Sequence, residues 1–294
     1  MTPDESALIA AIEANPVPDL PRLVYADWLE EHGHPVRAEF IRLQCEIDGL
    51  ETDRQDEVRA HHAGLWERQG ELLATHRGEL LGSLAGLPGR AKIDIKRGFP
   101  TWVELSVTDF LAHGAALDAA RPRPRVRVNL VADRLTEFVR SPHLGCVAEI
   151  GGYSPTLGVE LTFGDGTTIP TADELAAAAG RLVRLEVLDL EGCWLEDADC
   201  ERLSRLRFPA LVELDLSNNA ITDAGVSNLL RGALPKRLIL GGNPITDQGA
   251  VELADRLRNS PVEYLNLRRT HVGEEGWNAL LNRYQQGGRK VDLF

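Results

Sequence analysis

Hydrophobic positions in the first 86 residues recur at helical spacing. The chain opens with a capping-box pattern at residues 2–5, with proline at the first helical position. A second helix is expected from about Leu20 to His32, where Gly33 stops it, and a third begins at Pro35. Two further helices are predicted near residues 56–70 and 71–84. The expected inward positions are Leu8, Ile9 and Ile12, then Leu23, Val24 and Trp28 with Tyr25 as a further candidate, then Phe40, Ile41, Leu43 and Ile47.

The pattern changes after Gly89. Strand-like runs are predicted at residues 101–107, 126–130, 146–150 and 159–163. Helical stretches at residues 133–140 and 172–179 lie between several of them. Because strands that alternate with helices are typical of parallel sheets, we expect a parallel arrangement in this part of the chain.

From residue 185 the sequence repeats itself. Four segments align, "LEVLDLEGCWLEDAD", "LVELDLSNNAITDAG", "PKRLILGGNPITDQG" and "VEYLNLRRTHVGEEG". Their central leucines, at 188, 214, 238 and 265, are 26, 24 and 27 residues apart, and Val291 follows 26 residues later in "KVDLF". This period indicates a solenoid built from one repeated strand–helix unit.

Each repeat reads LxxLxLxxN/C/TxLxxD/ExG and is long enough to contain a helix. It resembles the leucine-rich repeat of the ribonuclease-inhibitor type, closely over residues 185–294 and loosely over 91–184. The resemblance implies an α/β horseshoe, with a parallel sheet on the concave side and helices on the convex side. We therefore expect an all-α N-terminal domain at residues 1–90, followed by a leucine-rich repeat solenoid at 91–294.

Two polar positions in the repeat have structural interpretations. The position shared by Cys193, Asn219, Asn243 and Thr270 lies where the chain leaves the strand, and an Asn there can bond backbone groups that the turn exposes. Thr222-Asp223 and Thr246-Asp247 are predicted helix N-caps.

The stretch "RLVYADWLEEHGHPVRAEFIRLQ", residues 22–44, is crowded with ionisable side chains. It resembles a short bacterial repeat-companion domain found N-terminal to leucine-rich repeats, over about residues 5–47, and "KRGF" at 96–99 is similar to the segment that follows that domain. The resemblance implies architecture and no biochemical activity. We interpret the charges as a clamp in which Asp27 and Glu39 pair with Arg22, Arg37 or Arg42.

An alternative for this stretch is a metal site formed by Glu31, His32, His34 and Glu39. A related hypothesis is a metal-dependent hydrolase at the domain junction that uses Asp27, His32 and His34. The two histidines flank a helix-stopping glycine, and their i, i+2 spacing matches no ligand pattern on one helix face. Metal analysis of the purified protein separates these alternatives from the clamp.

Charge and composition narrow the function classes. The 32 basic and 45 acidic residues give a net charge of −13, which argues against generic binding to nucleic acid or to anionic membranes. The N-terminus lacks the pattern of a signal peptide, and no apolar stretch approaches the roughly 18 residues of a membrane span. The four scattered cysteines suggest reduced thiols. We expect a cytoplasmic protein.

Other candidate chemistry is weak. "RPRPRVR" at residues 121–127 can bind an anion or RNA through its four arginines, yet it lacks interleaved aromatic residues and leads into a strand, so we interpret it as a solvated edge. "FGDGTT" at 163–168 is typical of a tight turn. The histidines at 61, 62 and 76, with Cys45, have no recognised ligand spacing. We predict no catalytic residue, no cofactor and no metal site.

The concave strand face is the predicted binding surface, for a protein partner and without catalysis. It combines acidic residues in the middle with arginines toward the C-terminus, which suits a partner of complementary charge. We also expect that the last strand leaves an edge open for self-association. The proposed contact residues are Asp189, Glu191, Glu213, Asp215, Ser217, Arg237, Ile239, Tyr264, Asn266 and Arg268, and Glu160, Thr162, Val187 and Arg269 belong to the same expected face.

Overall fold

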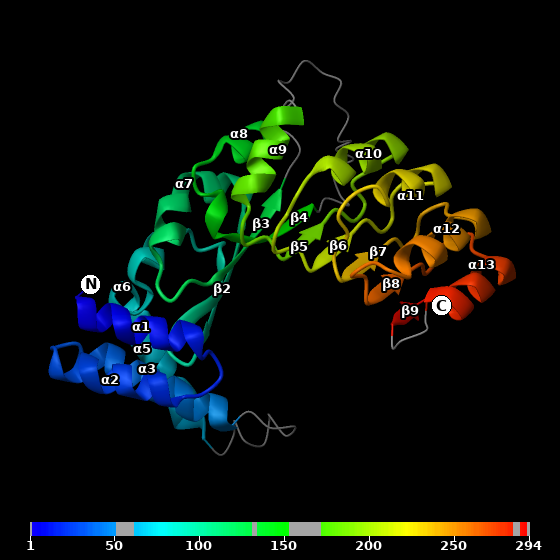
Figure 1. Ribbon diagram of the computed structural model, residues 1–294. Coiled ribbons are helices and arrows are strands. Elements are labelled where there is room, and N and C mark those ends of the chain that lie inside the picture. The colour runs from blue at the N-terminus through cyan, green and yellow to red at the C-terminus, as the bar shows by residue number, and fades with distance from the viewer. Residues whose placement is uncertain (1, 51–61, 131–133, 153–171, 285–288, 293–294) are drawn as a thin grey trace. The chain divides into compact units, whose positions relative to one another are not determined.

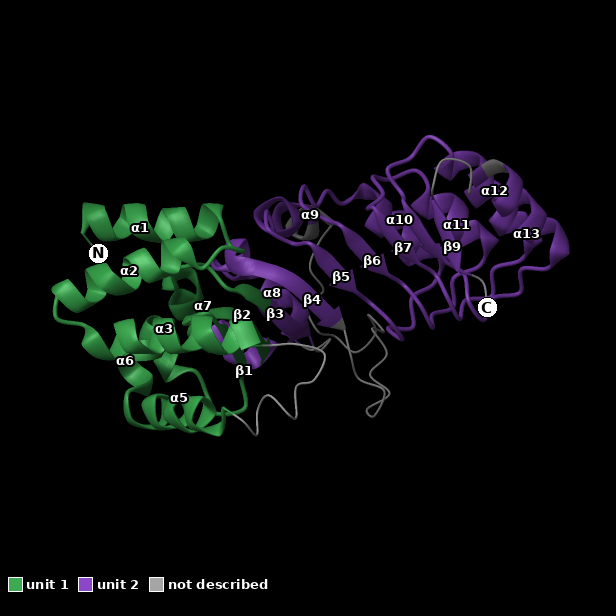
Figure 2. Cartoon of the chain, turned by 90° about the horizontal axis from the view of Figure 1, so that it is seen from below, with its two compact units in different colours: residues 1–105, 112–126 green, residues 106–111, 127–294 purple. Residues whose placement is uncertain are grey.

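The computed structural model describes residues 2–50, 62–130, 134–152, 172–284 and 289–292. The chain divides into two compact units, residues 1–105 with 112–126, and residues 106–111 with 127–294 (Figure 2). The domain boundary at residue 90 stays a prediction, and this division groups the strands that follow residue 90 with the N-terminal helices. The strand predicted at 159–163, with Glu160 and Thr162, lies outside the described residues, as do the 163–168 turn and the histidine at 61.

The N-terminal helices match the three that the hydrophobic pattern predicts (Figure 1). The expected break at residue 70 is wrong, because one helix runs through it. Up to residue 119 the elements are α1 (Pro3–Ala14), α2 (Leu20–Glu31), α3 (Pro35–Leu50), α5 (Ala63–Thr75), α6 (Arg77–Leu81), the 3-10 helix η1 (Gly82–Gly86), β1 (Lys92–Lys96), β2 (Phe99–Ser106) and α7 (Val107–Ala119).

Local signals place the helix ends. The Thr2 hydroxyl accepts a hydrogen bond from the Glu5 N–H at 3.1 Å, as an N-cap does. Gly33 has φ +84°, a left-handed conformation that ends α2 at low cost for a residue without Cβ.

Tyr25 is completely buried, whereas Val24 is 46% exposed, so the prediction that Val24 faces inward is wrong. The core around Tyr25 contains Ile9, Ile12, Ala26, Leu29, Ala38, Ile41, Cys45 and Phe99.

The expected charge clamp is partly confirmed. Arg42 pairs with Asp27 at 2.7 Å and with Glu30 at 2.6 Å, which joins α3 to α2. Glu39 pairs instead with Arg68 of α5 at 2.7 Å. Arg22 is buried and donates to the backbone carbonyls of residues 16 and 18, both at 3.0 Å. The clamp therefore uses one of the three predicted arginines.

The "KRGF" segment forms the tight turn between β1 and β2. Arg97 and Gly98 both have positive φ, 51° and 82°, as a two-residue hairpin turn of type I′ requires. The Arg97 side chain pairs with Asp48 at 2.5 Å and with Asp19 at 3.1 Å. A Cβ on Gly98 would lie 2.7 Å from the Ile41 Cα, so only glycine lets the turn pack this closely on α3. The segment thus fixes the hairpin to the helices.

The second unit alternates strands and helices. Its strands β4 to β9 pair in parallel and in chain order, and β3 is the neighbour of β4. The elements are β3 (Arg125–Leu130), α8 (Leu135–Arg140), the 3-10 helix η3 (Leu144–Cys146), β4 (Val147–Gly152), α9 (Ala172–Arg181), β5 (Val187–Asp189), α10 (Asp197–Arg205), β6 (Glu213–Asp215), α11 (Asp223–Leu229), β7 (Arg237–Ile239), α12 (Asp247–Leu257), β8 (Tyr264–Asn266), α13 (Glu274–Ala279), the π-helical turn η4 (Leu280–Tyr284) and β9 (Lys290–Asp292).

The predicted leucines set the register of this sheet. Leu188 aligns with Leu214, then Leu238, Leu265 and Val291 along the stacked strands. The four leucines are buried, and Figure 1 shows α10 to α13 together on one side of β5 to β9. Since strand side chains alternate between faces, the residues on either side of each leucine point away from these helices.

The asparagines form the predicted polar ladder. The Asn243 side chain, 1% exposed, donates to the carbonyls of Leu216 at 2.8 Å and Leu240 at 2.9 Å, and accepts from the Ile221 N–H at 3.1 Å. Asn219 makes the equivalent bonds one repeat earlier. Each side chain therefore satisfies backbone groups of two repeats.

A second ladder, of aspartates, joins the helix starts. Asp223 accepts from the Thr246 N–H at 2.8 Å and from its hydroxyl at 2.6 Å, while Asp197 does the same for Thr222. A Cβ on Gly249 would lie 2.3 Å from an Asp223 carboxylate oxygen, so the glycine of each repeat makes room for the preceding aspartate. The threonine caps are confirmed.

Among the described residues, no helix has the length and apolarity needed to cross a bilayer.

Candidate interaction surface

The ten predicted contact residues occur together on the side of the sheet opposite the helices, or in the loops directly after the strands. We call this set the strand face. Two of its rows are set by register, Glu213 beside Arg237 and Tyr264, and Asp189 beside Asp215, Ile239 and Asn266. None of the ten side chains is buried. The alternation therefore places them as predicted, and their role in binding stays a prediction.

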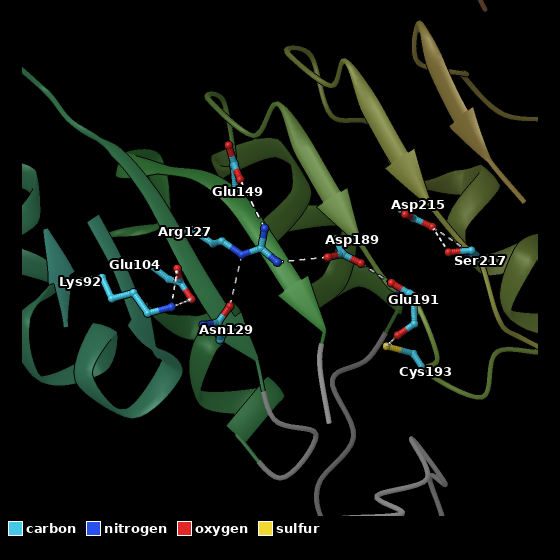
Figure 3. Close-up of polar contacts among 10 residues, drawn as sticks. All are labelled: Lys92, Glu104, Arg127, Asn129, Glu149, Asp189, Glu191, Cys193, Asp215 and Ser217. Atoms are coloured by element: carbon cyan, nitrogen blue, oxygen red, sulfur yellow. Dashed lines mark hydrogen bonds and ion pairs between the residues drawn. The ribbon is translucent and has the colours of Figure 1, made fainter. Parts of the chain in front are cut away.

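The acidic centre of the strand face lies on β5 and β6. Figure 3 shows Asp189 and Asp215 on adjacent strands, each beside a residue of its own loop. Asp189 accepts from the Glu191 N–H at 3.1 Å, and Asp215 accepts from the Ser217 N–H at 2.8 Å and the Ser217 hydroxyl at 2.5 Å. These turns hold the carboxylates at the carboxyl ends of the strands.

The acidic side chains lie close enough to influence one another. Single carboxylate oxygens of Asp189, Glu191 and Asp215 lie within 4.8 Å of one another. Burial raises the pKa of Asp215, and the neighbouring charges of Asp189 and Glu191 add to the increase, while the bonds from Ser217 oppose it. Oxygen ligands of this kind suit hard cations. Exposed acidic groups are common without an ion, and the arrangement attracts any cationic group, including a lysine or arginine of another protein.

Arg127, which we did not predict as part of this surface, borders the acidic centre. Its guanidinium lies 3.1 Å from Asp189 and 3.7 Å from Glu149 (Figure 3). A Cβ on Gly151 would be 2.6 Å from the Arg127 Nη2, so the missing side chain opens the path across β4. Gly151 is the register partner of Asp189. No sequence pattern links positions 127 and 189, since they come from different strands.

The basic end of the strand face is largely paired with acids. Arg237 bonds Glu213 at 2.6 Å and lies over the Tyr264 ring at 4.3 Å, and Arg268 pairs with Asp292 at 3.0 Å. Exposed pairs of this kind contribute about 0–1 kcal/mol each to stability. The expected separation of charge is therefore weaker than the sequence suggests, and the net acidity is concentrated on β5 and β6.

The sequence analysis also missed Trp194, which is 66% exposed. It has φ +56°, a conformation that is rare for a bulky residue. It follows Cys193, whose thiol donates to the Glu191 carbonyl at 3.6 Å and whose pKa burial raises to about 11. Tryptophan is enriched among the residues that dominate binding energy at protein interfaces. The signal in the sequence is an aromatic residue at a repeat position that elsewhere holds alanine, proline or histidine.

The alternative metal and hydrolase residues do not converge in the described structure. Asp27 pairs with Arg42, His32 bonds the Trp28 carbonyl at 2.7 Å and stacks on its ring, and His34 lies 3.9 Å from Glu79. The arginines of the 121–127 stretch separate as well. Arg121 bonds backbone carbonyls in the first unit, and Arg127 pairs with acids in the second.

Comparison with known proteins identifies the repeats. The family model described as "Leucine Rich repeat" matches residues 209–230 and 236–254. The chain carries leucine-rich repeats. The ribonuclease inhibitor of Sus scrofa is 32% identical over 117 residues, which cover 37% of this chain and 26% of that protein. The chain therefore matches about a quarter of that relative's length.

A solved internalin from Listeria monocytogenes aligns over 57% of this chain and 45% of its own, with 13% identity and a TM-score of 0.29. The predicted fold class, a leucine-rich repeat sheet with helices preceded by an N-terminal helical region, is confirmed by the family match and by the parallel ladder. Leucine-rich repeats generally serve as protein-binding modules, because stacked repeats display an extended surface.

Proposed function

We propose that the strand face binds a protein partner without catalysing a reaction. The observation that carries this proposal is the register of β5 to β8, which sets polar and aromatic side chains side by side on an open sheet. An extended sheet of this kind presents many contacts to another protein, whereas a small substrate is usually held in an enclosed pocket.

The charge of the surface suggests the chemistry of the partner. Asp189, Glu191 and Asp215 lie within reach of one cationic group, and Arg127 neutralises only part of their charge. We propose that the partner places a basic side chain over this acidic centre, where complementary charge speeds association and fixes orientation. Trp194 and Tyr264 supply the aromatic anchors that commonly dominate binding energy.

The test compares three purified variants with the wild type in capture from the native cell. A double change, Asp215→Arg with Tyr264→Ala, is expected to abolish recovery of the specific partner, and Trp194→Gly is expected to reduce its affinity at least tenfold. Since glycine adopts the left-handed conformation of residue 194 without strain, Trp194→Gly should alter the free energy of unfolding by less than about 1 kcal/mol.

The matched control places the same kinds of change on the helical side. Gln248 and Glu275 are both exposed and belong to α12 and α13. Gln248→Ala with Glu275→Arg should leave capture unchanged. Equal capture by wild type, the strand-face double variant and Trp194→Gly, with the fold intact by circular dichroism, would contradict the proposal.

A further inference from the structure

The first unit contains a cavity that has no part in the proposed function. Its volume is about 170 Å³, and it is lined by the start of α1, by α2 and α3, by the segment around η1 and by residues 119–122. Five polar residues contribute to its walls, Glu5, Tyr25, Arg37, Ser83 and Arg121. The remaining lining is mainly apolar, including Ile9, Leu80, Leu81, Leu84, Pro100 and Pro122.

Arg37 lines this cavity without a carboxylate partner in the described part of the chain. Its guanidinium lies over the Tyr25 ring, 5.8 Å from the centroid, and its Nε is buried and makes no hydrogen bond to a described residue. The acids expected to pair with it, Asp27 and Glu39, pair with Arg42 and Arg68. A buried donor left without a partner is unfavourable, so such a group in a native protein commonly marks a site that water or a ligand completes.

Arg121 brings a second guanidinium to the same cavity. Its Nη1 donates to the carbonyls of Asp118 at 2.7 Å and Ala120 at 2.6 Å, and these two bonds hold the guanidinium in place. The one carboxylate of the lining, Glu5, accepts the Tyr25 hydroxyl at 3.0 Å. Two arginines and one glutamate give the lining a formal charge of +1 in a chain of net charge −13. The local charge therefore favours an anion.

The size and the walls restrict which anion fits. A volume of 170 Å³ equals the liquid volume of about six water molecules, at about 30 Å³ each. The apolar lining favours a ligand with a hydrocarbon body over a fully hydrated oxyanion such as phosphate. A guanidinium offers a planar pair of donors that matches a carboxylate. We propose that this cavity binds a small aliphatic monocarboxylate, with Arg37 contacting the carboxylate and the leucine-rich wall contacting the chain.

The probe is butyrate, titrated into the full-length ¹⁵N-labelled protein at constant ionic strength. The side-chain Nε–H signal of Arg37, assigned by its loss in Arg37→Lys, is expected to shift in a saturable way. Arg37→Gln should weaken butyrate binding at least tenfold. The matched control is Arg77→Gln, which removes the same charge from an exposed position of α6 in the same unit and should leave binding unchanged.

Two further probes test the stated chemistry. Butylamine has a similar hydrocarbon body and the opposite charge, and inorganic phosphate has negative charge without the body, so both should bind at least tenfold more weakly than butyrate. A non-saturating shift, equal binding by Arg77→Gln and Arg37→Gln, or tighter binding of phosphate would overturn the proposal. If Arg37→Gln does not fold, Arg121→Gln takes its place. Weaker butyrate binding by Arg121→Gln than by the wild type supports the proposal, and equal binding contradicts it. Because the cavity and the strand face are different sites, capture of the protein partner tests the proposed function independently of butyrate binding.

Discussion

At the scale of single residues, Asp215 shows how position changes the chemistry of a common side chain. It aligns with Asp189 across the strand pair and bonds Ser217 in its own loop. Burial raises its pKa, so its negative charge is held at some expense of stability and is available to a cationic partner. The sequence predicts its place on the face, but only the neighbouring strand makes it part of a cluster.

This raised pKa predicts a pH dependence. A carboxyl whose pKa is higher in the folded than in the unfolded state favours folding while it is protonated, and this contribution is lost as pH rises from the unfolded pKa through the folded one. Asp215→Asn removes the effect. The free energy of unfolding of the variant minus that of the wild type should therefore increase with pH across this window. Urea unfolding from about pH 4 to about pH 7 measures it, and a difference that decreases with pH would refute the assignment.

At the scale of elements, the repeats are joined by two polar ladders in addition to the leucines. The asparagine ladder connects the loops after the strands, and the aspartate ladder connects the helix starts. The glycines at 225, 249 and 276 belong to the same packing, because a Cβ there would clash with the aspartate of the preceding repeat. The loops after β5 to β8 also share a left-handed residue, with φ from 55° to 69° at Gly192, Asn218, Gly242 and Arg269. The repeat consensus is therefore explained by contacts between neighbours as well as within a unit.

The asparagine ladder makes a specific prediction for stability. Asn243→Ala leaves the Ile221 N–H and the Leu216 and Leu240 carbonyls without this partner in a buried site, so we expect a loss of about 3 kcal/mol in the free energy of unfolding. Thr270 holds the equivalent position one repeat later, and its hydroxyl donates to the Leu267 carbonyl at 2.7 Å. Thr270→Ala should cost less than about 1.5 kcal/mol. Guanidinium unfolding compares the two, and equal losses would contradict the ladder.

At the scale of the whole molecule, the two compact units are stabilised by different means. The second unit is a stack of similar repeats, whereas the first depends on contacts between helices and the β1–β2 hairpin. Arg97, Gly98 and Phe99 make that connection, through ion pairs, close approach to α3 and burial beside Tyr25. The segment that resembles a family signature is thus a packing element of the first unit.

Gly98→Ala is expected to destabilise the first unit by about 2–3 kcal/mol, because it combines a left-handed backbone with a Cβ that clashes with α3. Hydrogen exchange should show lower protection in α1 to α3, while the repeats of β5 to β8 keep theirs. Gly89 is the control, since a Cβ there meets no atom within 4 Å. Unchanged exchange in Gly98→Ala, or equal loss in both units, would count against this account.

The sequence by itself determined the repeat period, the core leucines, the caps and which residues face away from the helices. These follow from local rules, because strand alternation and helical spacing are properties of consecutive residues. Which of two consecutive helix residues faces the core is harder to predict. Val24 was expected to face inward, but it is exposed and Tyr25 is buried.

Only the tertiary structure decided the charge pairs and the two candidate sites. Arg127 pairs with Asp189, which is 62 positions away in the chain. Glu39, which was expected to pair with Arg22, Arg37 or Arg42, pairs with Arg68 instead. Ion pairs depend on the distance between side chains of separate elements, and many pairings satisfy the same composition. The exposure of Trp194 and the absence of a hydrogen bond from the buried Arg37 Nε to any described residue both result from this packing, so the structure was needed to find them.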